Sequence, residues 1–340
     1  MLKKPMELHK GDTAATVSLS WGGAGDADLL WRYQVGKERL ETLFGLTVAE
    51  MPNTLKGSTY LADHPRTRAQ DLMDAFTNPS IKAVFSCIGG NDSIRLLPYI
   101  DVSLLADNPK IFLGYSDSTV THLMLFKAGV GSFYGPSILA EFAENLAVYP
   151  YTEHWVRKVL FSNETIGLIE PPLQWTGEYL AWTEENRTAS KHMVAHEGYQ
   201  VLQGEGVMEG FLLGGCLEVL DMCISTSVWP DFSGSLLFLE TSEETPAPHQ
   251  FSLILDRLAE AGMMSGIQGV LLAKPYQGLY EKEYLLILKR LLSRLGLPNL
   301  PVAYNLCFGH NEPMCVLPYG AQARFDCRTK AFSIIESGVC

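Results

Sequence analysis

The first half of the chain alternates short apolar runs with segments of helical periodicity. Apolar, β-branched runs at residues 15–20, 82–87 and 110–115 predict buried strands. Around them, apolar residues recur every three or four positions, which predicts amphipathic helices at residues 26–44, 66–76 and 119–128. Strands that alternate with helices of this length are typical of a parallel sheet covered on both faces. We therefore predict an α/β fold for this half.

The pattern changes after about residue 161. Residues 163–205 are rich in Glu, Thr, Trp and Gly, show weak periodicity and are broken by Pro171-Pro172, which indicates a linker or lid. Further on, two strong helical patterns, at 250–261 and 281–295, stand among short predicted strands at 236–239, 269–272, 302–306 and 331–335.

These changes divide the chain of 340 residues into three parts. We predict an N-terminal α/β domain over 1–162, a linker or lid over 163–205, and a C-terminal β-rich α+β domain over 206–340. At about 150 residues per domain, the length fits two domains. The 47% of hydrophobic and 19% of charged residues exclude an intrinsically disordered chain.

Charge and cysteine content narrow the possible partners. With 26 Lys and Arg against 38 Asp and Glu, the net charge is −12, so the chain lacks the basic surface that nucleic acids require. No segment approaches the ~20 consecutive apolar residues that span a bilayer, and no signal peptide is visible. We therefore expect neither a nucleic-acid nor a membrane partner. The odd number of cysteines, seven, is typical of reduced thiols in a cytoplasm.

A serine stands where a predicted strand turns into a predicted helix. The run at 110–115 leads into Ser116-Asp117-Ser118 and then directly into a helical pattern. Such a turn exposes the hydroxyl and supplies an oxyanion donor, here the Asp117 N–H, as a serine nucleophile requires. The lipase-type turn would have glycine in place of Ser118, however, and Ser116 is equally suited to capping the helix. Both interpretations remain open at this point.

A second loop, Gly89-Gly90-Asn91, also follows a predicted strand. Paired glycines let the backbone turn tightly and approach a ligand closely. The loop matches neither Gly-x-Gly-x-x-Gly nor a P-loop, so it does not predict phosphate binding. If the loop faces Ser116 across adjacent strand ends, its N–H groups form the second half of an oxyanion hole. The alternative is an ordinary turn.

A serine nucleophile also needs a base, and the base needs a group that orients it. His310 comes shortly after the predicted strand at 302–306, and Glu240 ends the apolar run at 236–239. A carboxylate at the end of a strand is well placed to hold an imidazole. Glu243 and Glu244 compete for this role, although they stand on an acidic loop where solvated side chains are the simpler interpretation.

Cysteines near His310 raise the question of a zinc site. Cys307, His310, Cys315 and Cys327 lack the paired Cys-x₂-Cys spacing of structural zinc sites. We therefore predict no metal ligands.

Taken together, these segments resemble the LD-carboxypeptidase (S66) family of serine peptidases, in particular its branch of MccF-like microcin immunity proteins. The matching segments run through most of the chain in the family's order: IGGNDSIRLLPYID (88–101), GYSDST (114–119), YGPS (134–137), FLLGGCLEVL (211–220), LLFLE (236–240) and FGHNEPMCVLPYG (308–320). The resemblance implies that Ser116 is the nucleophile, His310 the general base and Glu240 its orienting carboxylate.

The resemblance also implies an architecture. The N-terminal domain is expected to be a flavodoxin-like sandwich similar to class I glutamine amidotransferases, and the C-terminal β-rich domain to supply the glutamate and the histidine. The active site then lies between the two domains, in a protein that forms homodimers.

Two features of the sequence bear on the substrate. Many family members carry Gly-Gly-Asn-Leu where this chain has Cys216 in place of the asparagine, so a polar role of that residue is in doubt. The linker contains Trp175, Tyr179 and Trp182, and this aromatic insertion resembles the MccF-like branch, in which it helps to hold a nucleotide-linked substrate. Stacking on a base is worth ~1–3 kcal/mol per aromatic side chain. The alternative is a hydrophobic plug between the domains.

The sequence thus predicts a cytoplasmic serine hydrolase that needs no cofactor and cleaves an amide bond beside a free carboxylate or in an acyl-nucleotide. Asn91 and the linker aromatics are candidate substrate ligands, and Arg95 is a candidate for a substrate carboxylate or for a surface ion pair. One possible activity is an MccF-like amidase acting on peptidyl or aminoacyl nucleotides. Another is a muropeptide L,D-carboxypeptidase of cell-wall recycling. A catalytically idle peptide- or nucleotide-binding protein is the alternative of a different class, against which the presence of all three triad candidates argues.

Overall fold

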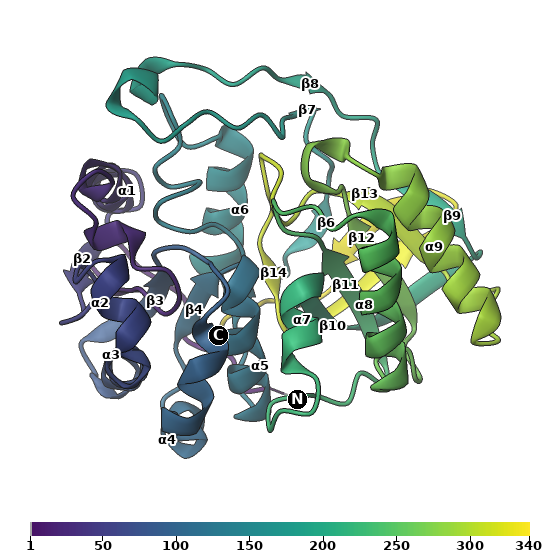
Figure 1. The fold of residues 1–340 in the computed structure, drawn as a ribbon, viewed down its shortest axis with the longest axis horizontal. Helices are drawn as coiled ribbons and strands as arrows, with labels where there is room; N and C mark the ends of the chain where they lie inside the picture. The colour runs from purple at the N-terminus through teal and green to yellow at the C-terminus, as the bar shows by residue number, and fades with distance from the viewer. Residues whose placement is uncertain (1) are drawn as a thin grey trace.

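The computed structural model describes residues 2–340, which form two large sheets side by side with helices packed on them (Figure 1). The first sheet has six strands in the order β14-β5-β4-β3-β1-β2. Five of them run parallel, which confirms the α/β fold predicted for the first half. These strands are β1 (Thr13–Val17), β2 (Thr47–Glu50), β3 (Ile81–Ser86), β4 (Ile111–Gly114) and β5 (Phe133–Tyr134). The sixth, β14 (Leu317–Pro318), pairs antiparallel with β5 although it comes from near the C-terminus.

Helix α5 lies at the junction of the two halves. The other helices of the first half are α1 (Leu30–Thr42), α2 (Ser58–Asp63), α3 (Pro65–Thr77), α4 (Val102–Asp107) and α6 (Pro150–Leu160). Helix α5 (Thr119–Lys127) is buried at every position from Thr119 to Leu125, as expected for a helix enclosed on every side. Its one buried imidazole, His122, is satisfied by Ser132 Oγ at 2.8 Å and Gly114 O at 2.9 Å. The N-terminus of α5 therefore opens at the boundary between the two sheets.

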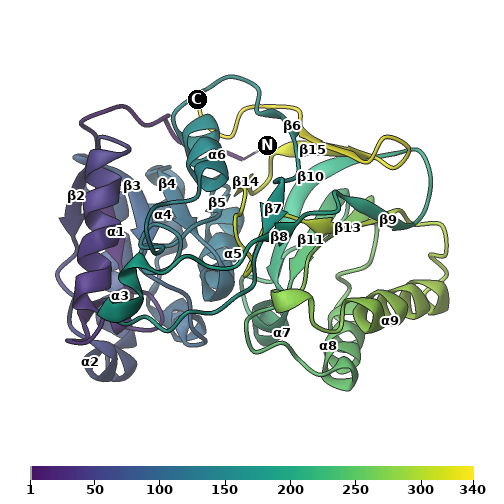
Figure 2. The ribbon, with the colours of Figure 1, turned by 90° about the horizontal axis from the view of Figure 1, so that it is seen from above.

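The second sheet has eight strands in the order β6-β16-β15-β10-β11-β12-β13-β9. Its four central strands run parallel and the others antiparallel. Helices α7 (Leu217–Cys223), α8 (Pro248–Glu260) and α9 (Glu281–Arg294) lie together on one face of it (Figure 2). The strands are β6 (Gly167–Ile169), β9 (Gln200–Gln203), β10 (Val207–Cys216), β11 (Ser235–Glu240), β12 (Gly269–Ala273), β13 (Val302–Leu306), β15 (Gln322–Asp326) and β16 (Ala331–Ile334).

The segment predicted as a linker or lid is tied into the second sheet at both ends. Strands β6 and β9 form its two edges, so the sheet draws strands from both sides of the predicted boundary at residue 206. Between them, residues 170–199 cross over the first half, as the teal trace at the top of Figure 1 shows. Within this crossing segment, β7 (Gln174–Trp175) and β8 (Val194–Ala195) pair as a small antiparallel ladder.

Two further features bear on the sequence predictions. All seven cysteines are free thiols, and five of them are buried. Over residues 2–340, none of the helices has both the length and the apolar composition that crossing a membrane would take.

Candidate active site

Ser116 occupies a strained turn directly after β4. Its φ is 60°, in the left-handed region that costs a non-glycine residue roughly 1–3 kcal/mol. The turn (Ser116–Ser118) leads straight into α5. The Ser116 N–H donates to the Tyr134 hydroxyl at 3.1 Å, whereas the Ser116 side chain caps no helix within residues 2–340. The capping interpretation therefore has no support in the structure, and the strained turn matches that of a serine nucleophile.

The Gly89-Gly90 loop faces Ser116, because β3 and β4 are neighbouring parallel strands. A Cβ atom at Gly89 would lie 2.8 Å from Ser116 Oγ and 3.4 Å from the Asp117 nitrogen, so only glycine fits beside the hydroxyl. Over residues 2–340, neither carbonyls nor side chains accept from the N–H groups of Gly89, Gly90 and Asp117. These N–H groups are therefore available to a developing oxyanion.

The buried Asp117 side chain has a role that the sequence did not reveal. Its Oδ2 accepts hydrogen bonds from the N–H groups of Asp92 at 2.9 Å and Ser93 at 2.8 Å, while Ser93 Oγ donates to the Asp117 carbonyl at 2.8 Å. The residue that offers its N–H beside Ser116 thus also fastens the glycine loop in place. An aspartate directly after a candidate nucleophile was the only signal in the sequence, and it does not identify the partner.

His310 lies between two glutamates. Its Nδ1 is 2.6 Å from Oε2 of Glu240, the last residue of β11, and Glu240 is only 1% exposed. Its Nε2 is 3.0 Å from Oε2 of Glu243, on the loop that follows β11. The structure therefore puts Glu240 where an orienting carboxylate belongs and Glu243 on the nitrogen that a general base would use. No hydrogen bond joins Ser116 and His310 in the part of the chain that the structure describes.

The two carboxylates keep the imidazole charged. Burial opposes the charged form, but Glu240 and Glu243 outweigh it, so the pKa of His310 lies well above its usual value. In return, the hydrogen bond from His310 lowers the pKa of Glu243 to about 2. Both ring nitrogens thus face a carboxylate, which favours the protonated imidazolium form of the ring.

Tyr134, in β5, connects the two halves of the site. Its buried hydroxyl accepts from the Ser116 N–H and donates to Oε1 of Glu240. Burial and the nearby Glu240 raise the pKa of this hydroxyl far above its usual value, so it stays a donor. In the sequence, Tyr134 stood out only as part of the YGPS segment that matches the family. Its contact with Glu240 could not be predicted, because a tyrosine in a short strand does not show which carboxylate it reaches.

Gly309 allows Glu240 to approach His310. A Cβ atom at Gly309, whose φ is +86°, would lie 2.6 Å from Oε2 of Glu240. We expect Gly309→Ala to reduce kcat/KM by about 10²-fold, because the carboxylate that orients the imidazole is pushed aside. Gly11→Ala is the matched control, since Gly11 has a φ of +94° and open space around it. Both variants carry the cost of a left-handed alanine. Equal activity of the two in a steady-state assay would contradict the prediction.

A cavity of about 740 Å³ opens beside these residues. It is lined by the glycine loop and Ser116 on one side, by α7 and the loop after β11 on the other, and by the crossing segment above. Of the predicted substrate ligands, Asn91, Tyr179 and Trp182 line it, whereas Trp175 and Arg95 do not.

Arg95 and Trp175 are engaged outside the cavity. Arg95 donates to the Ala62 carbonyl at 2.7 Å and pairs with Asp92 at 3.2 Å, which is the surface ion pair that the sequence left as its alternative role. The Trp175 ring lies under the Lys274 ammonium, 4.6 Å from the ring centroid.

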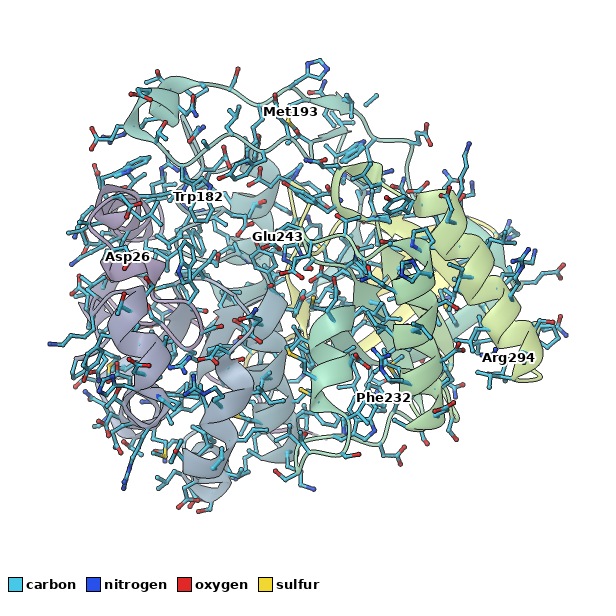
Figure 3. The ribbon with its side chains drawn as sticks, viewed as in Figure 1. Asp26, Trp182, Met193, Phe232, Glu243 and Arg294 are labelled. Carbon is cyan, nitrogen blue, oxygen red and sulfur yellow. The ribbon has the colours of Figure 1, made fainter. Side chains whose placement is uncertain are left out.

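Trp182 forms an aromatic end of the cavity. Its ring stacks on that of Trp21, with centroids 6.4 Å apart and planes 24° apart, and the Arg32 guanidinium lies 4.6 Å from the Trp182 centroid. Figure 3 shows Trp182 below the crossing segment on the side of α1, and Glu243 near the middle of the molecule. Neither Trp21 nor Arg32 was predicted, because both are far from the linker in the sequence.

Two protein-family models match the chain and identify its family. The model of the LD-carboxypeptidase N-terminal domain matches residues 15–135, and that of the LD-carboxypeptidase C-terminal domain matches residues 209–325. The chain belongs to the LD-carboxypeptidase (S66) family. The two matched regions contain Ser116 and Glu240 with His310, respectively.

Individual S66 relatives match most of the chain or nearly all of it. The microcin C7 self-immunity protein MccF of Escherichia coli is 28% identical over 83% of this chain and 82% of its own. The Probable murein peptide carboxypeptidase of Bacillus subtilis is 27% identical over 99% of this chain and 95% of its own. Because relatives such as this one are named as carboxypeptidases, the comparisons support a peptidase activity for the chain.

Solved structures of similar proteins have the same fold as this chain. That of an MccF-like protein from Streptococcus pneumoniae in complex with AMP is 33% identical and has a TM-score of 0.89, covering 96% of this chain and 99% of its own. That of MccF in complex with aspartyl sulfamoyl adenosine is 26% identical, with a TM-score of 0.86, and covers 99% of this chain and 100% of its own.

Cys216, where many S66 members carry asparagine, lines the cavity of this member. Burial raises the pKa of its thiol well above the usual value, and its Sγ donates to Glu218 Oε2 at 3.4 Å. The neutral thiol is thus a weak donor that faces a carboxylate. Over residues 2–340, His, Cys, Asp and Glu side chains form no group of three that could hold a metal ion.

Lys191 ties the crossing segment of this S66 protein to the site. Its ammonium pairs with Glu144 at 2.6 Å and also with Glu312, two residues after His310. Thr176 and Glu312 exchange backbone hydrogen bonds as well, at 2.7 and 2.9 Å. One ammonium therefore serves two buried carboxylates, and burial raises the pKa of Glu312 to about 8.

This raised pKa makes stability depend on pH. Between about pH 4.5 and 8 the folded protein holds a proton on Glu312 that the unfolded chain has lost, so stability falls as pH rises. The decrease is at most about 1.4 kcal/mol per pH unit. We expect thermal unfolding of Glu312→Gln between pH 5 and 8 to show a smaller decrease than that of the wild type. If the stability of both proteins fell equally between pH 5 and 8, Glu312 would not be the source of the pH dependence.

Proposed function

We propose that this protein is a serine amidase that cleaves aminoacyl or peptidyl nucleotides through Ser116, His310 and Glu240. The observation that carries the proposal is the strained Ser116 turn, which faces free N–H groups and lines the same cavity as an imidazole held by a buried carboxylate. These are the parts that acyl transfer requires: nucleophile, base, orienting group and oxyanion donors.

The proposed reaction has two halves. His310, neutral at Nε2, takes the Ser116 proton as Oγ attacks the carbonyl carbon, and the N–H groups of Gly89, Gly90 and Asp117 stabilise the oxyanion. The C–N bond then breaks, and the amine leaves with the proton that His310 returns. In the second half, water attacks the acyl-enzyme while His310 takes its proton. The carboxylic acid departs, and the proton returns to Ser116.

The aromatic end of the cavity supports a nucleotide as the leaving group. Trp21, Trp182 and Arg32 offer stacking surfaces and a positive charge at a distance from Ser116, within one continuous cavity. The S. pneumoniae relative was solved in complex with AMP, and MccF in complex with aspartyl sulfamoyl adenosine. A base that stacks on Trp182 would gain ~1–3 kcal/mol.

Removal of a terminal D-residue from a murein peptide is the second candidate. It is favoured by the B. subtilis relative, whose similarity extends over 99% of this chain. In this case the cavity would bind a peptide, and the tryptophans would contribute only to packing.

One incubation separates the two activities. A muropeptide tetrapeptide and an aminoacyl sulfamoyl adenosine are offered together, and the products are identified by mass spectrometry. Release of the amino acid from the nucleotide supports the proposal, while loss of only the terminal D-alanine supports the second candidate. If neither substrate is cleaved, a binding protein becomes the better interpretation.

We expect Trp182→Ala to lower kcat/KM for the aminoacyl nucleotide by roughly 10-fold, since stacking on the base is lost. Trp175→Ala removes the same side chain outside the cavity and serves as the control. Equal losses in both variants, measured in the same steady-state assay, would contradict a nucleotide-binding role of Trp182.

A further inference from the structure

The Glu243 carboxylate contacts the imidazole nitrogen of His310 that the proposed reaction needs. A base must accept a proton at Nε2, but in the structure Nε2 lies 3.0 Å from the Glu243 carboxylate, which favours a proton on that nitrogen. The Glu243 side chain is 63% exposed and stands on the loop after β11, so it is free to move, unlike the buried Glu240. The contact with Glu243 therefore disfavours the neutral form of His310 that a general base requires.

The wall around Glu243 carries unbalanced negative charge. Glu218, Glu243 and Glu244 all line the cavity, and over residues 2–340 none of them pairs with a lysine or an arginine. Burial and the nearby Glu240 raise the pKa of Glu218, which shows that further negative charge is unfavourable there. Glu144 and Glu312, which also line the cavity, by contrast share the ammonium of Lys191. The imidazolium of His310 is thus the one cation that Glu243 pairs with in the described residues.

We propose that an ammonium group on the acyl residue of the substrate draws Glu243 away from His310, so that the enzyme acts preferentially on acyl residues with a cationic side chain. This inference rests on the proposed function and assigns its substrate class. When Glu243 turns to the substrate's ammonium, the Nε2 proton passes to water and His310 becomes the free base. A substrate with a carboxylate in the same place would meet the acidic wall and leave Glu243 where it is.

Other groups around His310 do not provide the same switch. Glu240 faces Nδ1 and stays buried, and the Tyr115 ring packs edge-on, 5.0 Å from the imidazole. Tyr276 lines the cavity near Glu243, and Glu312, on the loop of His310, is held by Lys191. Among these groups, only Glu243 combines direct contact with Nε2 and an exposed side chain.

The first test needs no turnover. His310 is titrated by NMR in the wild type, in Glu243→Ala and in Glu244→Gln, a loop neighbour that does not contact the imidazole. We expect the midpoint in Glu243→Ala to fall by about one pH unit or more, a tenfold loss of proton affinity, and that in Glu244→Gln to move much less. An unshifted His122 signal shows that the variants are folded. Coinciding midpoints of the wild type and Glu243→Ala would overturn the proposal.

The second test compares lysyl, norleucyl and glutamyl sulfamoyl adenosine, whose acyl side chains are cationic, neutral and anionic; the lysyl and norleucyl compounds differ by the ammonium group alone. In the wild type, kcat/KM should be at least tenfold higher for the lysyl than for the norleucyl compound, and lowest for the glutamyl compound. Glu243→Ala should raise the norleucyl rate severalfold at pH 6 and lower the lysyl rate, because the substrate's ammonium loses its partner, so the ratio collapses. A wild type that prefers the glutamyl compound, or a ratio unchanged in Glu243→Ala, would overturn the inference. A wild type that cleaves none of the three contradicts the proposed function, while the NMR titration still decides the role of Glu243.

Discussion

Replacing Ser116 with alanine is expected to lower kcat by on the order of 10⁶ and to leave the fold intact. In the proposed reaction the hydroxyl supplies the attacking oxygen, and over residues 2–340 Ser116 is the serine that a side chain at Gly89 would meet. Stability should barely change, because the Ser116 side chain caps no helix in residues 2–340 and its loss strands no buried partner. Turnover of the aminoacyl nucleotide and thermal unfolding are measured on the same preparation.

Ser118→Ala is the matched control for this variant. Ser118 stands on the same turn and is also buried, but its hydroxyl lies against Gly114, away from the cavity lining. We expect Ser118→Ala to keep most of the activity. If Ser116→Ala retained turnover near that of Ser118→Ala, the nucleophile would be assigned wrongly.

Replacing Glu240 with glutamine is expected to lower kcat by roughly 10⁴, the loss typical of a triad whose carboxylate becomes an amide. Glu240 accepts from two donors at once, His310 Nδ1 and the Tyr134 hydroxyl. A glutamine has one carbonyl oxygen, so its NH₂ group must face one of these donors. The imidazole is then no longer held in the orientation and tautomer that place a free Nε2 toward Ser116.

Glu243→Gln separates the two candidate acids. Its carboxylate lies on Nε2, so its loss should cost far less activity than the loss of Glu240, and should raise activity on the acidic side of the pH profile. The profile of kcat/KM against pH is measured for both variants. A larger loss in Glu243→Gln than in Glu240→Gln would make Glu243 the orienting acid and contradict the assignment.

Most of the fold follows from local patterns in the sequence. The run at 302–306 and the helical pattern at 281–295 agree with β13 and α9 to within a residue, because their apolar periodicity is strong. Short strands such as β5 and β14 were not predicted, since two residues carry no periodicity. Strands β6 and β9 were assigned to a linker because an edge strand with half-exposed side chains shows a weak pattern.

By itself, the sequence determined the candidate nucleophile, base and glycine loop of this S66 protein, because each follows an apolar strand at the edge where parallel strands end. Only the tertiary structure shows which imidazole nitrogen each of Glu240 and Glu243 reaches, since two carboxylates three residues apart are alike in the sequence. It also brought Tyr134 to Glu240 and Lys191 to Glu312, 106 and 121 residues apart in the chain. Such pairs depend on how two sheets pack, and packing is a property of the whole chain that no local pattern records.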